Sequence, residues 1–270
     1  MSPVAHVLVW VYGALLVIPV YFMLISSFKT NEAIFNSPFA FPTSFSFSNF
    51  VNAWQNASMG TALVNSTIVT VVAELLTLVL AVPASYAIAR GRGRASKVVE
   101  GVFAAGLLVP GFAALVPTVL LAVAVGLFHT REFLFLFFPA TVLPLSVILL
   151  AQFMRSVPAE LEESAMIDGA SRVRILISVY IPIVVPGIAT VAILNFLTFW
   201  NEYLFSLILA GPETDVRTVQ VALPALVSQT NTQYGVLIAG ALITMIPVYI
   251  VYIVLNRRLE DALLQGALKG

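Results

Sequence analysis

A charged segment, Pro158-Ala159-Glu160-Leu161-Glu162-Glu163-Ser164-Ala165-Met166-Ile167-Asp168-Gly169-Ala170, lies between long apolar runs of the chain. Ser156 can cap its first turn, Pro158 stands where a missing N–H costs nothing, and the glutamates collect at the positive end of the helix dipole. Gly169 favours the end of this helix, and Ser171 can begin a second short one. The segment predicts a helix of roughly ten residues. Helices shorter than about 12–15 residues are marginal in water, so this one needs a surface to pack against.

The apolar groups of this helix do not share one side. Leu161, Ala165 and Asp168 share a face by their spacing, whereas Met166 and Ile167 lie elsewhere on the helix. A helix that packs on one surface would not need both sets. From these residues alone, two interpretations stay open: a helix folded back onto its own bundle, or a helix that docks on another protein.

The composition predicts an all-α polytopic membrane protein. Hydrophobic residues make up 60% of the chain and charged residues 10%, whereas soluble chains carry about 25% charged residues. Apolar stretches of about 20 residues, the length that crosses a bilayer core, recur along the sequence. A formal net charge of zero gives no basic field for nucleic acid, and the absence of cysteine excludes disulfides and thiol chemistry.

We predict about six spans in a single transmembrane domain covering residues 1–270. They lie near 4–25, 61–89, 99–127, 133–154, 183–209 and 234–255. The first run has no small-residue cleavage pattern, so we expect a retained span and not a signal peptide. Prolines occur in nearly every span, which favours kinked helices around an internal path.

The positive charges predict the orientation. Lysine and arginine are concentrated in the loop 90–97, in the loop 155–182 and in the tail after residue 255, all on one side of the predicted membrane. Because such an excess marks the cytoplasmic face, we expect both termini and the charged segment to be cytoplasmic. The opposite side holds residues 28–60, which are rich in phenylalanine, proline and serine. This outer segment is either a cap with its aromatics in the interfacial belt or a contact surface for an extracytoplasmic partner.

The spacing of Glu163-Ser164-Ala165, Gly169 and Ile181-Pro182 resembles the EAA loop of ABC importer permeases. In that family the loop forms a coupling helix seated in a groove of a cytoplasmic ATPase subunit, and closure of the ATPase dimer tilts the spans. Ser164 departs from the usual alanine, a small-for-small change that should leave docking intact. The resemblance implies an ATPase-coupling set of Glu160, Glu163, Ser164, Ala165, Asp168, Gly169 and Ala170.

Further stretches resemble the carbohydrate-importer branch, in particular its maltose-permease-G-like subunit. They are Asp168-Gly-Ala-Ser171, Phe199-Trp-Asn-Glu-Tyr-Leu204 and the ending 265–270. The branch usually has valine where this chain has Leu268, and often aspartate at Glu202. The resemblance implies a permease subunit in the prokaryotic inner membrane that translocates a sugar or related polyol. Its implied partners are a second homologous permease, two ATPase subunits and an extracytoplasmic solute-binding protein.

The sequence contains no Gly-x-x-x-x-Gly-Lys-Ser/Thr phosphate loop. We therefore expect this chain to bind no cofactor and the partner subunits to use ATP and magnesium. The loop Gly91-Arg-Gly93 is too short and basic for a phosphate cradle and suits the anionic inner leaflet. No nucleophilic set suggests an enzyme, and His6 and His129 lack metal-ligand companions in sequence.

A cluster of polar and aromatic residues in the fifth predicted span suggests a substrate path. Its members are Asn195, Trp200, Asn201, Glu202 and Tyr203. Amide and carboxylate groups suit sugar hydroxyls, and aromatic rings suit sugar ring faces. A charged side chain in a span costs about 2.5–3.5 kcal/mol, so Glu202 should face protein or water. Alternatively, the asparagines hydrogen-bond neighbouring helices and the aromatics belong to the outer interfacial belt.

A further acidic residue, Glu74, lies well inside the predicted span 61–89. It could hydrogen-bond a neighbouring helix or couple transport to protons. The competing function is therefore an ion-coupled secondary transporter that uses Glu74 or Glu202, but this hypothesis leaves the EAA-like loop unexplained.

Overall fold

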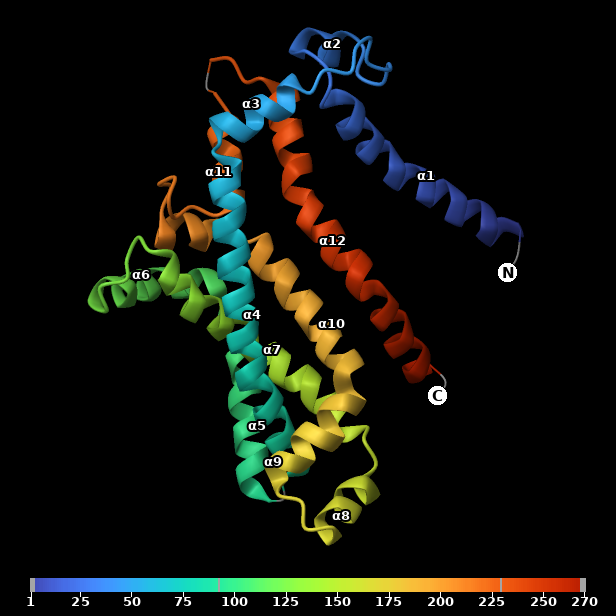
Figure 1. Ribbon diagram of the computed structural model, residues 1–270, viewed down its shortest axis with the longest axis vertical. Coiled ribbons are helices and arrows are strands. Elements are labelled where there is room, and N and C mark those ends of the chain that lie inside the picture. Colours follow the sequence, from blue (N-terminus) through green and yellow to red (C-terminus); the bar gives the residue numbers. More distant parts are fainter. Residues whose placement is uncertain (1–2, 92, 229, 268–270) are drawn as a thin grey trace.

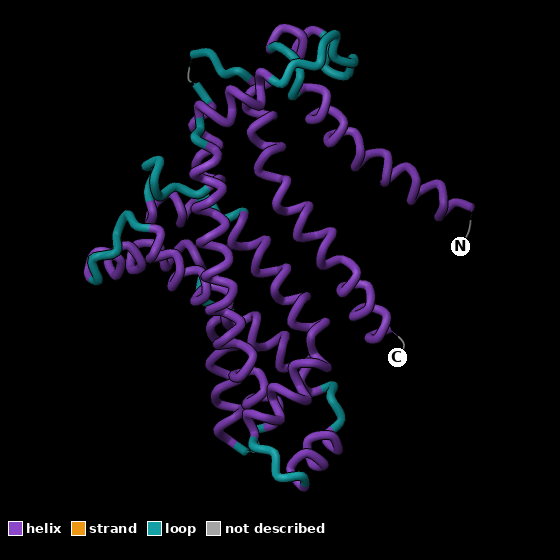
Figure 2. The backbone as a smooth tube through the Cα atoms, in the orientation of Figure 1, coloured by secondary structure: helices purple, strands orange, loops and turns teal. Residues whose placement is uncertain are grey.

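The computed structural model describes residues 3–91, 93–228 and 230–267, and every regular element in these ranges is helical (Figures 1 and 2). Leu268 and Lys269, which belong to the predicted tail, lie outside the described residues. Five stretches are long and apolar enough to cross a membrane: Val4–Ser26, Met59–Arg90, Arg131–Arg155, Arg172–Trp200 and Tyr234–Val254. The helices that form them are α1 (Pro3–Ser26), α4 (Met59–Arg90), α7 (Arg131–Arg155), α10 (Ile181–Trp200) and α12 (Tyr234–Ala267). The predicted all-α polytopic fold is confirmed.

The predicted span near 99–127 is not one straight helix. It is divided into α5 (Arg94–Gly106), the turn η1 (Gly111–Ala114) and α6 (Leu115–Ala124), and the two halves meet at 89°. Pro110 has an extended backbone, with ψ of 120°, and has no N–H to continue a helix. This proline lies at the break, so α6 projects away from the bundle (Figure 1). If this bent pair counts as one span, the structure has up to six.

The predicted span near 183–209 also differs from the observed helix. It begins earlier, because α9 (Arg172–Ile175) and the π-helical turn η2 (Leu176–Tyr180) run directly into α10. The π turn stands ahead of Pro182, and the N–H of Ile181 bonds to the carbonyl of Leu176, five residues back. At the other end α10 stops at Trp200, and a separate π turn, η3 (Ser206–Ala210), follows.

Helices α4 and α7 form the main packed pair, and α10 lies against both. Close approach between them depends on small residues, as is usual between membrane helices. A Cβ atom added to Gly187 of α10 would lie 2.4 Å from Cγ of Phe153 on α7. Large buried side chains at the lower end of the bundle include Met154, Ile175 and Tyr180. We call this tightly packed cluster at the lower end of the bundle, which contains Met154, Ile175 and Tyr180, the platform.

The outer segment forms a cap at one end of the bundle. It contains α2 (Asn31–Asn36) and α3 (Ser48–Asn56), and α3 packs against α12. The ring of Phe28 lies 5.4 Å from each of the rings of Phe45, Phe47 and Phe50. The short helices α11 (Val219–Ala222) and η4 (Leu223–Leu226) also pack near α3 and α12. The predicted cap is present, and its contact with an extracytoplasmic partner stays a prediction.

The opposite end carries α8 (Ala159–Ile167), together with the loop that joins α4 to α5 (Figure 1). The two basic loops that the sequence assigned to one side of the membrane therefore lie at one end of the structure. The aromatic cap lies at the other end. For these two loops, this is the arrangement that the distribution of lysine and arginine predicted, and the cytoplasmic assignment of this end stays a prediction.

Candidate functional site

The start of α8 differs from the sequence prediction. The N-cap residue is Pro158, with ψ of 136°, and no side chain caps the turn. Ser156 does not cap α8, because its hydroxyl donates to the carbonyl of Phe153 at 2.8 Å, at the end of α7. The first turn instead carries Glu160 and Glu162, whose charges favour the positive end of the helix dipole.

The end of α8 is a complete Schellman motif. Gly169 has φ of +77°, the N–H of Gly169 bonds to the carbonyl of Met166 at 3.0 Å, and the N–H of Ala170 bonds to that of Ala165 at 3.0 Å. The predicted stop at Gly169 is confirmed. Ser171 then caps α9 by accepting a hydrogen bond from the N–H of Arg174, as the sequence also predicted.

No residue of α8 is buried. Of the predicted common face, only Ala165 packs against the platform, while Leu161 and Asp168 stay exposed. Ile167 is 87% exposed and Met166 is about half exposed. The apolar groups that the sequence found in excess are therefore uncovered in this chain, on a short helix that has little packing of its own.

Glu162, which sequence reasoning missed as a site residue, attaches α8 to the platform. The hydroxyl of Tyr86 donates to its Oε1 at 3.0 Å, and the hydroxyl of Tyr180 donates to its Oε2 at 2.7 Å. Nε of Arg90 lies 3.3 Å from Oε2 as an ion pair. Tyr86 and Arg90 are one helical turn apart at the end of α4. This pair of polar side chains at the end of a span is the sequence feature that could have indicated a polar contact there.

Arg90 extends this network to α7. Its Nη2 donates to the carbonyl of Val157 and, at 3.4 Å, to that of Met154. Its guanidinium also lies over the ring of Tyr180, 5.2 Å from the centroid, where a cation–π attraction adds to the ion pair. We call Glu162, Arg90, Tyr86 and Tyr180 the clasp. It joins α8 to the ends of α4 and α7 and to η2.

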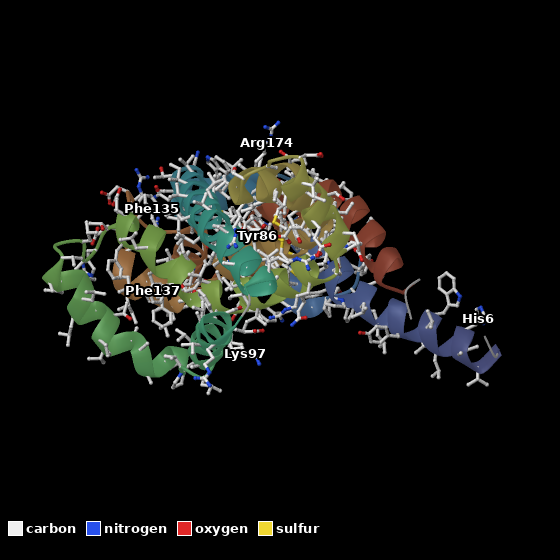
Figure 3. The ribbon with its side chains drawn as sticks, turned by 90° about the horizontal axis from the view of Figure 1, so that it is seen from below. His6, Tyr86, Lys97, Phe135, Phe137 and Arg174 are labelled. Carbon is white, nitrogen blue, oxygen red and sulfur yellow. The ribbon has the colours of Figure 1, made fainter. Side chains whose placement is uncertain are left out.

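A cleft of about 720 Å³ lies beside the clasp. It separates the first turn of α8 from the end of α4 and the start of α5, and its lining includes Gly91, Ser96, Val99, Glu163 and Met166. Figure 3 views the molecule from this end, with Tyr86 near the middle of the bundle and with Lys97 and Arg174 on its outer edges.

The predicted path residue Asn195 is buried between helices. Its Oδ1 accepts a hydrogen bond from Ser146 of α7 at 3.1 Å, and its Nδ2 lies 3.5 Å from Oε1 of Glu74 on α4. Asn195 and Glu74, which the sequence treated separately, are thus brought together. The contacts match the interhelical hydrogen bonds that the sequence left open as the alternative for both residues.

Trp200 and Glu202 both have structural partners. Trp200 is buried, and its indole N–H donates to the carbonyl of Thr244 on α12 at 3.1 Å, so it does not belong to an interfacial belt. The carboxylate of Glu202 accepts the backbone N–H groups of Phe205 and Ser206 at 2.8 and 2.7 Å. Glu202 therefore caps the turn that leads into η3.

Asn201 and Tyr203, the other two predicted path residues, remain exposed on this chain. Asn201 accepts a hydrogen bond from Gln220 at 3.4 Å through Oδ1, and Tyr203 is 41% exposed. Among the described residues, no group of three or more histidine, cysteine, aspartate or glutamate side chains could hold a metal ion.

A family of known proteins matches this chain over most of its length. The family model "Binding-protein-dependent transport system inner membrane component" matches residues 81–265, which include α8 and the whole clasp. The chain belongs to this family. It is a multi-pass inner-membrane permease, a non-catalytic subunit of an ABC transporter complex that contains a binding protein and ATPase subunits.

Individual relatives are similar to the permease along nearly its full length. The diacetylchitobiose uptake system permease protein NgcG of Streptomyces coelicolor is 35% identical over 99% of this chain and 89% of the relative. The melibiose/raffinose/stachyose import permease protein MelC of Bacillus subtilis is 30% identical over 94% of this chain and 91% of the relative. A solved bacterial ABC transporter involved in the import of the acidic polysaccharide alginate has a chain of similar fold. It is 25% identical, with a TM-score of 0.78, over 95% of this permease and 98% of that chain.

Membership in this family favours ATP-driven import over the ion-coupled secondary transporter that Glu74 or Glu202 suggested. The geometry agrees, because the carboxylate of Glu202 is occupied by backbone N–H groups and Glu74 lies beside Asn195. The permease therefore needs no titrating carboxylate to explain its energy source.

Proposed function

We propose that the permease imports an oligosaccharide or a related sugar delivered by an extracytoplasmic binding protein, and that α8 is the helix through which an ATPase subunit drives it. The observation that carries the proposal is the uncovered state of α8. A helix of 9 residues with no buried residue is held by few contacts in this chain, yet it ends in a well-formed Schellman motif. Such a helix is suited to complete its packing on a partner.

The names of the relatives support the sugar class. NgcG is a permease for diacetylchitobiose, MelC is one for melibiose, raffinose and stachyose, and the structural relative takes part in alginate import. All of these substrates are chains of sugar units. Within the permease, the exposed Asn201 and Tyr203 are the groups best placed to meet such a substrate, because an amide and an aromatic ring suit its hydroxyls and ring faces.

A second, homologous permease and two ATPase subunits complete the proposed assembly. The first span supports a permease pair, since only 6% of an 18-residue apolar stretch of it is buried within this chain and α1 diverges from the bundle (Figure 1). Such a surface suits lipid on one side and a partner helix on the other. ATP and magnesium would bind to the ATPase subunits, and this chain would bind no cofactor.

The docking face of α8 is the side opposite to Glu162 and Ala165. It presents Glu160, Ser164 and Ile167, with Glu163 beside them, and all of these side chains are exposed. A groove on the ATPase that offers basic and apolar groups would fit this face. Movement of that groove during ATP hydrolysis would then move α8 and the helices attached to it.

Charge reversal on this face tests the proposal. We expect Glu163→Lys to lose co-purification of the ATPase subunits and sugar uptake together, because a cation would meet the basic groove. Glu213→Lys, the same charge reversal at an exposed position between η3 and α11, is the matched control for ATPase association and should retain it. Full ATPase association and uptake in Glu163→Lys would refute the assignment of α8. A panel of oligosaccharides, tested for stimulation of ATPase activity in the reconstituted complex, would identify the substrate.

A further inference from the structure

We propose that Glu162 is a positioning residue that transmits movement of α8 to α4 and α10 through the clasp. This inference rests on the proposed function, because it assumes that an ATPase subunit moves α8. It assigns a role to a residue that lies on the side of α8 away from the docking face.

The first step is that polar contacts, and not apolar packing, hold α8 against the rest of the chain. No residue of α8 is buried, and a cleft of about 720 Å³ runs along its first turn. Ala165 is the residue of α8 that packs against the platform, and its side chain is a single methyl group. Apolar burial of this size cannot fix the angle of a helix.

The second step is that Glu162 supplies the missing constraint. Its two oxygens are held by two tyrosine hydroxyls and by Arg90, at distances between 2.7 and 3.3 Å. By contrast, no hydrogen bond or ion pair involves the side chains of Glu160 or Glu163 within the described part of the chain. The three neighbouring glutamates therefore differ in their contacts: within the described residues, Glu162 is bonded to the platform, and Glu160 and Glu163 are not.

The third step is that the partners of Glu162 are themselves rigid. Tyr180 is fully buried, Tyr86 is 8% exposed, and their rings lie 4.9 Å apart in an edge contact. The side chains of Glu162 and Arg90 are only 15% and 19% exposed. Charge-assisted hydrogen bonds in such a sheltered place are stronger than those of an exposed ion pair.

The fourth step is the identity of the connected helices. Tyr86 and Arg90 belong to α4, whereas Tyr180 belongs to η2, which continues directly into α10. A displacement of α8 thus acts at one carboxylate on two spans at once. Asn195, which contacts Glu74 of α4, lies on α10, and the exposed Asn201 follows directly after the last residue of this helix. The clasp is thus a short polar route from α8 to α4 and to α10, and α10 carries Asn195 and Trp200 of the candidate path.

The test compares Glu162→Ala with Glu163→Lys in the complete transporter, reconstituted with its binding protein. Three quantities are measured: ATPase co-purification, ATP hydrolysis, and sugar imported per ATP hydrolysed. We expect Glu162→Ala to keep ATPase association and to lower sugar per ATP by at least about fivefold, the low end of typical coupling between sites. Glu163→Lys should lose association itself.

Two further variants keep the test informative if Glu162→Ala is poorly assembled. Tyr180→Phe removes one hydroxyl and retains the buried ring, and Glu162→Gln retains the shape of the side chain. Both should show a smaller loss of sugar per ATP at normal assembly. Tyr180→Phe in the Glu162→Ala background should add little further loss, because the two residues act through one contact.

The outcomes separate this inference from the proposed function. Unchanged sugar per ATP in Glu162→Ala and Tyr180→Phe would overturn the transmission role. Loss of ATPase association in Glu162→Ala, in parallel with Glu163→Lys, would also overturn it, since Glu162 would then only support docking. Full association and uptake in Glu163→Lys would instead overturn the proposed function on which the inference rests.

Discussion

The glycine that ends α8 offers a sharp test of how this helix is built. Gly169 has φ of +77°, and a Cβ atom added there would have no heavy atom within 4 Å. Substitution at this position therefore costs backbone conformation and not space. For most L-residues the left-handed region costs about 1–2 kcal/mol, and for β-branched residues it is a real outlier.

These numbers predict an order of activity among variants of Gly169. A cost of about 1–2 kcal/mol shifts the equilibrium away from the Schellman turn by roughly 5- to 30-fold. Asn tolerates the left-handed region, so Gly169→Asn should stay close to the wild type, Gly169→Ala should be weaker, and Gly169→Val should be weakest. The assay is co-purification of the ATPase subunits and sugar uptake at matched levels of the permease in the membrane.

The comparison of Asn with Val decides the interpretation, because the Asn side chain has one more heavy atom than that of Val and extends further from the backbone. If Gly169→Asn fails as badly as Gly169→Val, side-chain size on a contact surface is the cause and the backbone reasoning is refuted. If Gly169→Val is fully active, the left-handed turn is not needed for coupling.

Three other substitutions have expected outcomes of different kinds. Gly187→Leu should prevent close packing of α10 on α7 and lower the amount of assembled permease. Phe153→Ala in the same chain should restore part of that amount. Normal assembly of Gly187→Leu alone would contradict the observed contact. Glu202→Ala should cost about 0.5–2 kcal/mol as a lost cap, seen as lower thermal stability of the purified complex, with the preference among sugars unchanged. A changed preference would place Glu202 in the path. Trp200→Phe should lose the hydrogen bond to the carbonyl of Thr244, which is worth about 0.5–1.5 kcal/mol. The purified complex should then have lower thermal stability and still take up sugar. Unchanged thermal stability would contradict a structural role for Trp200.

Signals that lie close together in the chain could be predicted from the sequence. Gly169 and Ser171 define the junction between α8 and α9 because their bonds reach only three to five residues. The broad positions of the spans follow from apolar composition for a similar reason, since a bilayer imposes a minimum length on any helix that crosses it.

Features that depend on distant parts of the chain could not be predicted. Glu162 meets Tyr86, which is 76 residues away, and no spacing rule selects it over Glu160 or Glu163. The break at Pro110 was visible as a proline, but prolines occur in nearly every span and most of them leave their helices continuous. Whether a proline bends or divides a helix depends on the neighbouring helices that satisfy its freed backbone groups.

Glu202 shows how an intramembrane charge can mislead. An acidic residue in a predicted span indicates a functional site, because its insertion is costly. Here α10 ends at Trp200, and the carboxylate of Glu202 accepts hydrogen bonds from the backbone N–H groups of the next turn. These hydrogen bonds offset the cost of placing the charge in the membrane. The prediction of a continuous span concealed this helix end and therefore the capping role.

The central claim is that the outer face of α8 docks on an ATPase subunit, and a cross-link tests it most directly. The natural chain has no cysteine, so Ser164→Cys places a single thiol on that face, and Ser178→Cys places one on an exposed position of η2 as the control. With a short thiol-specific photo-cross-linker in the assembled transporter, we predict that Ser164→Cys joins the permease to an ATPase subunit and that Ser178→Cys does so much less. Equal cross-linking from both positions, or none from Ser164→Cys, would contradict the claim.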